Sequence, residues 1–180
     1  MSTAASPPAF KGPIIVMGVS GCGKSSIGER LAAHLGLPYV EGDSLHPPAN
    51  IAKMSEGIPL DDGDRWPWLE IIGRRLAEAD DAGIVISCSA LKRIYRDQLR
   101  QAAGRPLAFV YLKGSRDILL QRMTERPGHF FKAPLLDSQL ATLENPEGEG
   151  FVVTVDIAPS PDAITAKALE GLAALNGVEP

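Results

Sequence analysis

The sequence is poor in cysteine, in aromatic residues and in positive charge. Of its 180 residues two are cysteines and 6% are aromatic, and Lys and Arg number 18 against 22 Asp and Glu. Cys22 and Cys88 lack the spacing of a disulfide framework or a zinc site, so we expect two small buried thiols in a reducing, cytoplasmic compartment. The net charge of −4 excludes a global basic field that would hold nucleic acid.

Long apolar runs are missing as well. No stretch approaches the length needed to cross a membrane, and residues 1–10 lack the basic start and the apolar run of a signal peptide. We therefore expect no membrane partner and interpret residues 1–12 as a disordered N-terminal lead. The hydrophobic fraction of 44% and the length fit one compact domain, which we place at residues 13–177.

A glycine-rich turn stands between an apolar run and an amphipathic segment. Residues 18–25 read GVSGCGKS and match the phosphate-binding pattern G-x-x-x-x-G-K-[ST]. The apolar run 14–17 before the turn is typical of a buried strand. After the turn, Ile27, Leu31 and Leu35 recur at helical spacing. A chance glycine-rich turn would lack these flanks, so the sequence predicts a P-loop that binds a nucleotide.

Each type of residue in this turn has a chemical task. Glycines allow backbone N–H groups to converge on phosphate oxygens. We expect Lys24 to reach the β- and γ-phosphates, and Ser25, in the first turn of the following helix, to bind Mg²⁺. The predicted nucleotide-binding residues are Gly18, Val19, Ser20, Gly21, Cys22, Gly23, Lys24, Ser25 and Ser26.

Strand and helix patterns alternate along the rest of the chain. Strands are expected at 14–17, 37–41, 84–88, 107–112 and 151–155. Helices are expected at 25–35, 49–55, 91–103, 115–126 and 162–175, with a further helix that has Asp64 as its N-cap and fades near Glu78. This alternation predicts an α/β fold, in which a parallel sheet of five strands carries helices on both faces. The order of the strands does not follow from the pattern.

Residues 42–69 differ from the rest in being dense in charge and proline and in containing both tryptophans. A long polar segment inside a compact domain is more often a binding loop than filler, so we interpret it as the acceptor-binding region. Asp43 lies two residues after a predicted strand, at the edge where parallel sheets form their crevice. It is placed to accept a proton from an acceptor hydroxyl or to orient it, with a plain solvated carboxylate as the alternative. We expect Trp66 and Trp68 to brace this region.

Two further groups of polar residues complete the predicted site. Arg122 and Arg126 lie one helical turn apart before the breaker Pro127-Gly128. We expect both to act on the transferring phosphate from a mobile lid at about 122–138, with a solvated helix end as the alternative. Each residue of the other group, taken alone, is equally consistent with a surface position. Together they suggest a set that binds a polyol and a carboxylate: His46, Lys53, Arg65, Lys92 and His129.

Several longer motifs accompany the P-loop. They are GDSLHP at 42–47, N-x-x-K-M-x-x-G-x-P-L at 50–60, DRWPWL at 64–69, SCSALK at 87–92, RPGHFF at 126–131, and LLDSQ at 135–139 followed by Leu143-Glu144. With these motifs the chain resembles the gluconokinase family of small P-loop kinases, kin to shikimate and adenylate kinases, from Ile14 onward. Glu41 stands where the family leads us to expect an aspartate, and Asn145-Pro146 where a Pro-Pro pair often follows.

The resemblance implies a three-layer fold like that of nucleoside-monophosphate kinases and a homodimer. It also implies MgATP-dependent phosphorylation of D-gluconate at its 6-hydroxyl, with ATP and Mg²⁺ as cofactors. Two alternatives stay open. One is a kinase of the same fold that acts on shikimate or on another sugar acid; a shikimate-type enzyme should show a glycine-rich strand end in place of Ser87-Cys88-Ser89 and a clear D-x-D where Glu41-Gly42-Asp43 stands. A nucleotide-sensing module without catalysis would not need Lys24, Asp43 and the lid arginines.

Overall fold

The computed structural model describes residues 9–125 and 132–176. Five strands form one sheet: β1 (Ile14–Met17), β2 (Tyr39–Glu41), β3 (Val85–Ser87), β4 (Ala108–Lys113) and β5 (Val152–Asp156). The helices are α1 (Lys24–Leu35), α2 (Pro48–Ser55), α3 (Asp62–Glu78), α4 (Arg93–Ala103), α5 (Arg116–Thr124), α6 (Lys132–Thr142) and α7 (Pro161–Ala174). A 3₁₀ turn, η1 (Gly42–Leu45), follows β2. The predicted alternation of strands and helices is confirmed.

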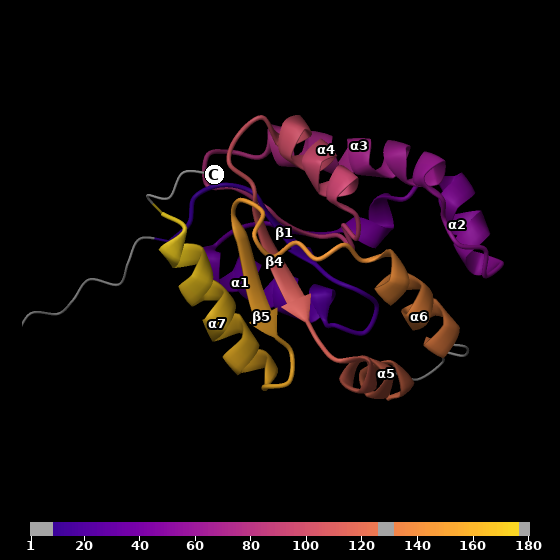
Figure 1. The fold of residues 1–180 in the computed structure, drawn as a ribbon. Helices are drawn as coiled ribbons and strands as arrows, with labels where there is room; N and C mark the ends of the chain where they lie inside the picture. Colours follow the sequence, from indigo (N-terminus) through magenta and orange to yellow (C-terminus); the bar gives the residue numbers. More distant parts are fainter. Residues whose placement is uncertain (1–8, 126–131, 177–180) are drawn as a thin grey trace, which may run out of the picture.

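The sheet has the strand order β2-β3-β1-β4-β5, and all neighbouring strands run parallel. Successive side chains of the central strand β1 point to opposite faces, as in any strand. Ile14 and Val16 pack into a core with residues of α1 and α7, whereas Ile15 and Met17 pack with residues of α3 and α4. Figure 1 shows the resulting three layers, with α1 and α7 on one side of the sheet and α3 and α4 on the other. The predicted architecture is confirmed.

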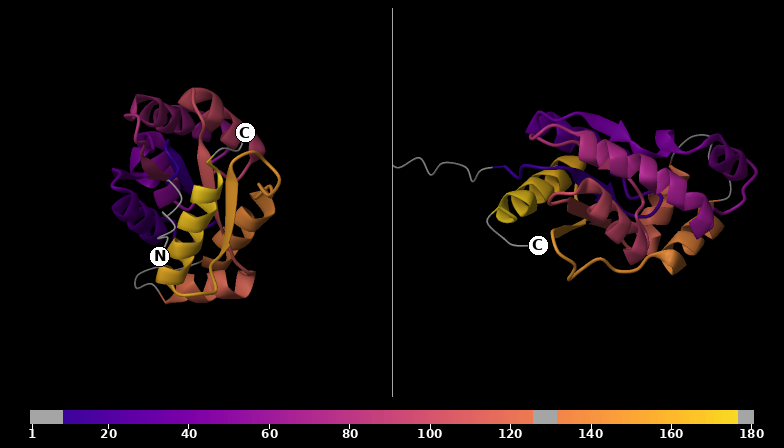
Figure 2. Two further views of the ribbon diagram at one scale, coloured as in Figure 1. Left: turned by 90° about the vertical axis from the view of Figure 1, so that its left-hand side faces the viewer. Right: turned by 90° about the horizontal axis from the view of Figure 1, so that it is seen from above.

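The carboxyl ends of the strands all lie at one edge because the sheet is parallel. The P-loop follows β1 there, and η1 follows β2. In Figures 1 and 2, α2 and α6 both lie at the end of the molecule beyond these strand ends, on opposite sides of it. The predicted donor and acceptor regions therefore meet at the same edge of the sheet.

The helix α3 begins earlier than predicted, because its N-cap is Asp61 and not Asp64. The Asp61 side chain accepts a hydrogen bond from Asp64 N at 2.7 Å, and the Asp64 side chain accepts one from Asp61 N at 3.1 Å. This reciprocal pair is a capping box, with Asp64 as the third residue of the helix. The prediction of Asp64 as N-cap is wrong because a run of closely spaced aspartates offers several possible caps.

The helix α6 was not predicted, since we assigned residues up to 138 to the lid. Its apolar pattern is weak: Leu136 is completely buried, but Leu135 beside it is 49% exposed. Pro134 stands in the first turn of the helix, where proline is tolerated. Residues 126–131 lie outside the described residues.

Packing of the domain includes a residue that we assigned to the N-terminal lead. Phe10 is buried, and its ring meets the ring of Phe151 edge-on with centroids 6.2 Å apart. Residues 1–8 of the lead lie outside the described residues. Among the helices of residues 9–125 and 132–176, none combines the length and the apolar character that crossing a membrane requires.

Both cysteines are buried free thiols, as predicted. Burial raises the pKa of Cys88 to about 12, so its thiol stays protonated at neutral pH. Cys22 lies in the P-loop, where its Sγ packs against Gly18: a Cβ on that glycine would lie 2.7 Å from the sulfur. Both side chains therefore act as small apolar groups.

Candidate active site

The P-loop, residues 18–25, forms a tight turn after β1. Gly21 and Gly23 have φ angles of 84° and 91°, in the left-handed region that favours glycine. Lys24 Nζ donates a hydrogen bond to the carbonyl oxygen of Val19 at 3.1 Å. The ammonium group therefore lies against the loop, where a phosphate is expected to bind.

Ser25 is connected to the ends of β2 and β3 through Glu41. Glu41 Oε2 accepts hydrogen bonds from Ser25 Oγ at 2.5 Å and from the Tyr39 hydroxyl at 2.8 Å. Glu41 Oε1 accepts a hydrogen bond from Ser87 Oγ at 2.9 Å. Burial alone would raise the pKa of Glu41, but these hydrogen bonds and the charge of Lys24 outweigh it and hold the pKa below its usual value. Glu41 is therefore an anion beside the P-loop serine.

The oxygens of Ser25 and Glu41 fit a magnesium ion. Mg²⁺ prefers hard oxygen ligands and is usually held by one or two carboxylates, substrate phosphates and waters. Glu41 has one methylene more than the expected aspartate and still reaches the Ser25 hydroxyl directly. In the part of the chain that the structure describes, no cluster of His, Cys, Asp and Glu could hold a metal ion alone. A magnesium ion here would thus need phosphate oxygens to complete its coordination sphere.

His46, one of the predicted substrate residues, is 8% exposed and tightly packed. Its ring stacks on Trp68, with centroids 4.1 Å apart and planes at 17°. Asn50 Nδ2 lies 3.2 Å from His46 Nδ1. Because the Asn50 amide nitrogen can only donate, Nδ1 is the acceptor and the proton of the neutral ring lies on Nε2. Burial, together with the nearby Arg65 charge, lowers the pKa of His46, while Asp43 opposes this effect. The imidazole is therefore neutral at pH 7.

Trp68 braces the start of the acceptor-binding region, as predicted. Its Nε1 donates a hydrogen bond to the carbonyl oxygen of Gly42 at 2.8 Å, and the side chain is buried. A Cβ on Gly42 would lie only 1.9 Å from the carbonyl oxygen of Ser87, so this close approach of the ends of β2 and β3 requires glycine. Trp66, in contrast, is 37% exposed and meets the ring of Tyr95 edge-on.

The predicted cations Lys53 and Lys92 are both paired with carboxylates at the start of α3. Lys53 Nζ lies 2.7 Å from Asp64 Oδ2, and Lys92 Nζ lies 3.0 Å from Asp62 Oδ1. All four side chains are partly exposed, so these ion pairs stay accessible to a polar ligand. The two lysines are thus held in place at one end of α3.

Arg65 lies against the aromatic ring of Tyr95, with its guanidinium carbon 5.5 Å from the ring centroid. Lys92 Nζ lies 5.7 Å from the same centroid. The Tyr95 hydroxyl donates a short hydrogen bond to Asp62. Burial is the main cause that raises the pKa of Tyr95 far above its usual range, and this hydrogen bond also raises it. Within the described residues, the Arg65 guanidinium forms no hydrogen bond or ion pair. Its donors are therefore available to a carboxylate.

Asp43 lies in η1 with an exposed side chain. Among residues 9–125 and 132–176, its carboxylate has no hydrogen bond or ion pair, which leaves both oxygens available to an acceptor hydroxyl. Arg122, on α5, donates a hydrogen bond to the carbonyl oxygen of Ile157, just after β5. Arg126 and His129 lie outside the described residues.

Sequence reasoning missed two residues near the site and one buried arginine elsewhere that holds the segment after α6. Tyr95 was not considered, and no local pattern marks it apart from its place on a helix that follows β3. Gln139, on α6, accepts a hydrogen bond from the P-loop backbone at Ser20 N, at 2.6 Å. Its signal was its place in the LLDSQ motif, to which we assigned no role. Arg96 is the third.

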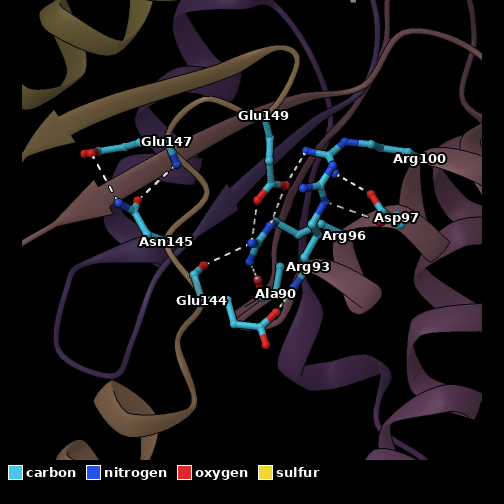
Figure 3. Close-up of polar contacts among 9 residues, drawn as sticks. All are labelled: Ala90, Arg93, Arg96, Asp97, Arg100, Glu144, Asn145, Glu147 and Glu149. Carbon is cyan, nitrogen blue, oxygen red and sulfur yellow. Dashed lines mark hydrogen bonds and ion pairs between the residues drawn. The ribbon is translucent and has the colours of Figure 1, made fainter.

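Arg96 is completely buried and connects α4 to the segment that follows α6 (Figure 3). Its Nε and Nη2 donate to Glu149 at 3.0 and 2.7 Å, and Arg100 Nη2 donates to the same carboxylate at 2.9 Å. Arg96 also donates to the carbonyl oxygens of Ala90 and Glu144, at 2.7 and 3.0 Å. Burial raises the pKa of Glu149, but the two arginines outweigh it and hold the pKa below its usual value.

A cavity of about 380 Å³ lies away from the P-loop and from the acceptor-binding residues. Its lining includes Pro106 and Leu107, which precede β4, and Gly150 and Phe151, which precede β5. It therefore lies at the amino ends of these strands, at the edge opposite the P-loop. Arg100 is one of the arginines that line this cavity, and it already forms ion pairs with Glu149 and with a neighbouring aspartate. The cavity is not part of the candidate active site.

Comparison with known proteins identifies the family. A gluconokinase of Gluconobacter oxydans is 48% identical over 153 residues, which cover 84% of this chain and 85% of that protein. The crystal structure of a gluconokinase from Sinorhizobium meliloti is 57% identical with a TM-score of 0.88, and the likeness covers 93% of this chain and 95% of that one. The chain belongs to the gluconokinase family. The resemblance seen in the sequence is confirmed.

The relation to shikimate kinases is more distant. A family model described as shikimate kinase matches residues 20–147. The solved shikimate kinase of Aquifex aeolicus is 14% identical with a TM-score of 0.60, a level that shows a shared fold only. Since the gluconokinases match at 48% and 57% identity, neither the shikimate alternative nor the non-catalytic one is favoured for this member of the gluconokinase family.

Proposed function

We propose that the protein transfers the γ-phosphoryl group of ATP to the 6-hydroxyl of D-gluconate, giving 6-phospho-D-gluconate and ADP. The observation that carries this proposal is the extent of the likeness to a gluconokinase, which covers 93% of the chain. The uncovered share of the chain is too small to leave out most of the acceptor-binding region, 42–69. The substrate is a small molecule, and the donor that the kinase family implies is ATP.

The P-loop supplies the donor half of the reaction. Its backbone N–H groups and Lys24 hold the phosphates and offset their charge. Ser25 and Glu41 would hold Mg²⁺, which when bound neutralises charge on the phosphate oxygens. The partial positive charge at the start of α1 adds to this effect at the same place.

The acceptor half of the reaction is assigned to Asp43 and the side chains around it. The acceptor oxygen forms a bond to the γ-phosphorus, the bond from that phosphorus to the ADP oxygen breaks, and the hydroxyl proton passes to Asp43. Arg65 is the proposed partner of the substrate carboxylate, because its guanidinium donors have no partner in the described part of the chain. The remaining proposed contacts to the polyol are His46, Lys53, Lys92 and His129.

Arg122 and Arg126 are proposed to offset charge on the transferring phosphoryl group. In this proposal, residues 122–138 act as a lid that excludes water during transfer. The hydrogen bond from Arg122 to Ile157 keeps its guanidinium near the end of β5, at the same edge of the sheet as the P-loop. We further propose a homodimer that acts in the cytoplasm.

A coupled assay of ADP release tests the acceptor. With D-gluconate, shikimate, glycerate and glucose as acceptors, we expect kcat/KM to be highest for gluconate, by about 10²-fold or more. A site built from fixed hydrogen-bonding groups discriminates strongly against ligands that leave them unpaired. A preference for any of the other three acceptors would contradict the assignment, and chelation of Mg²⁺ is expected to abolish the activity.

Replacing Asp43 with asparagine tests the proposed base. The amide cannot accept the hydroxyl proton, so we expect kcat to fall by about 10²- to 10⁴-fold, while the Kd for ATP stays unchanged. Asp81→Asn, an exposed aspartate in the turn before β3, is the matched control and is expected to have no effect. A normal kcat in Asp43→Asn would show that the proton goes elsewhere.

A further inference from the structure

A side chain from α6 forms a hydrogen bond within the P-loop. The backbone N–H of Ser20 donates to Gln139 Oε1 at 2.6 Å, although the two residues are 119 positions apart in the sequence. The contact is partly buried, so water competes with it less than at an open surface. Ser20, at the apex of the loop, thus finds its hydrogen-bond acceptor on a distant helix.

The apex of the P-loop has few backbone hydrogen bonds of its own. Within it, Cys22 N donates to the Val19 carbonyl oxygen at a long 3.3 Å. Gly21 and Gly23 add the conformational freedom of residues without a side chain. A loop that must aim several N–H groups at one phosphate loses affinity if it has to be ordered on binding. An external hydrogen bond at Ser20 reduces that cost.

The helix α5 supports the same loop at the next residue. A Cβ on Gly21 would lie 2.6 Å from Met123 Cγ and 2.9 Å from the Leu119 carbonyl oxygen, so loop and helix are in direct contact. The helices α5 and α6 are joined in turn, because Arg116 donates two hydrogen bonds to Asp137, at 2.6 and 3.1 Å. The P-loop therefore rests against two connected helices.

The end of α6 fixes the position of Gln139. Leu143 N donates to the Gln139 carbonyl oxygen at 2.9 Å, and Glu144 N donates to the Leu91 carbonyl oxygen at 2.8 Å. The carbonyl oxygen of Glu144 also accepts from Arg96 Nη2 at 3.0 Å (Figure 3). Leu91 closely follows β3, so these bonds tie the end of α6, just beyond the proposed lid, to the sheet. Gln139 can thus hold Ser20 at a fixed place relative to the strand ends.

We propose that Gln139 is a positioning residue for the phosphoryl donor: its side-chain carbonyl holds the apex of the P-loop in the conformation that binds the nucleotide phosphates. The inference rests on the proposed function, in which the P-loop binds ATP. Gln139 acts through Ser20 and needs no contact with the reacting atoms. A competing role, in which Gln139 Oε1 blocks a phosphate oxygen from Ser20 N, predicts a change in ATP affinity of the opposite sign.

Gln139→Met removes the acceptor and keeps the length of the side chain. We expect the Kd for ATP, measured by calorimetry without acceptor, to rise about three- to tenfold, as loss of one hydrogen bond implies. The KM for ATP should rise in the same proportion, whereas the KM for gluconate and the Tm stay unchanged. Exchange of the Ser20 amide proton with solvent, followed by NMR, should become faster.

The matched control is Gln121→Met, since the Gln121 side chain lies exposed on α5 and donates to Glu125 at 3.3 Å. It should change none of these quantities. An unchanged Kd for ATP in Gln139→Met overturns the proposal, and a lowered Kd overturns it in favour of the competing role. Equal rises in both KM values with a lower Tm would also overturn it, as a general loss of packing. ATP binding is measured without acceptor, so an error in the gluconate assignment would leave this result unaffected.

Discussion

Replacing Lys24 with methionine is expected to lower kcat by about 10²- to 10³-fold, the usual cost of removing one group that stabilises transition-state charge. Methionine has nearly the same length as lysine but no charge. The fold should persist, because the Lys24 side chain is not part of either core and its hydrogen bond is to the nearby Val19 carbonyl oxygen. Turnover is measured by coupled ADP release, and folding by circular dichroism and Tm.

Lys167→Met, an exposed lysine on α7, provides the matched control. It removes the same charge far from the P-loop and should leave kcat unchanged. If Lys24→Met kept full turnover at saturating ATP, Lys24 would not act on the transferring phosphate. If only the KM for ATP rose, the ammonium would bind the ground state and the transition state equally well.

Replacing Arg96 with methionine is expected to cause the largest loss of stability, about 3 to 5 kcal/mol. The change leaves the Glu149 carboxylate, whose side chain is 7% exposed, with Arg100 as its remaining ion-pair partner. It also leaves the carbonyl oxygens of Ala90 and Glu144 without the donors that satisfy them. For a chain of this length, such a loss lowers the Tm by roughly 10 °C, which calorimetry or thermal circular dichroism measures.

Arg93→Met serves as the control for this variant, because the Arg93 side chain is 67% exposed and forms an ion pair with the Asp97 carboxylate at 3.7 Å. An exposed pair of this kind contributes at most about 1 kcal/mol. A Tm loss in Arg96→Met no larger than in Arg93→Met would mean that the buried network contributes no more than a surface ion pair.

Features encoded by adjacent residues were predictable from the sequence. The apolar run of β1, the glycines of the P-loop and the spacing of Ile27 and Leu31 on α1 are all local signals. The cap of α3 is local too, but Asp61 and Asp64 are equally suitable caps by residue type. Only the backbone geometry decides between them.

Features that depend on distant partners were not predictable. The strand order follows from how the helices pack, and no single segment encodes it. The contacts of Gln139 with Ser20 and of Arg96 with Glu149 join residues 119 and 53 positions apart. A glutamine and an arginine among polar neighbours in the sequence do not indicate such partners. The helix α6 was not predicted because the apolar pattern around Leu136 is weak, and its packing also depends on distant residues.

The central place of β1 also has a consequence for folding kinetics. Ile14 pairs with Val85 on one side and with Ala108 on the other, so both neighbours of β1 come from much later in the chain. Pairing of this kind closes long loops before it gains stabilising contacts, which slows folding. Because Ser20 also depends on Gln139, the P-loop acquires its binding geometry only when most of the chain is in place. Nucleotide affinity should therefore report on completed folding.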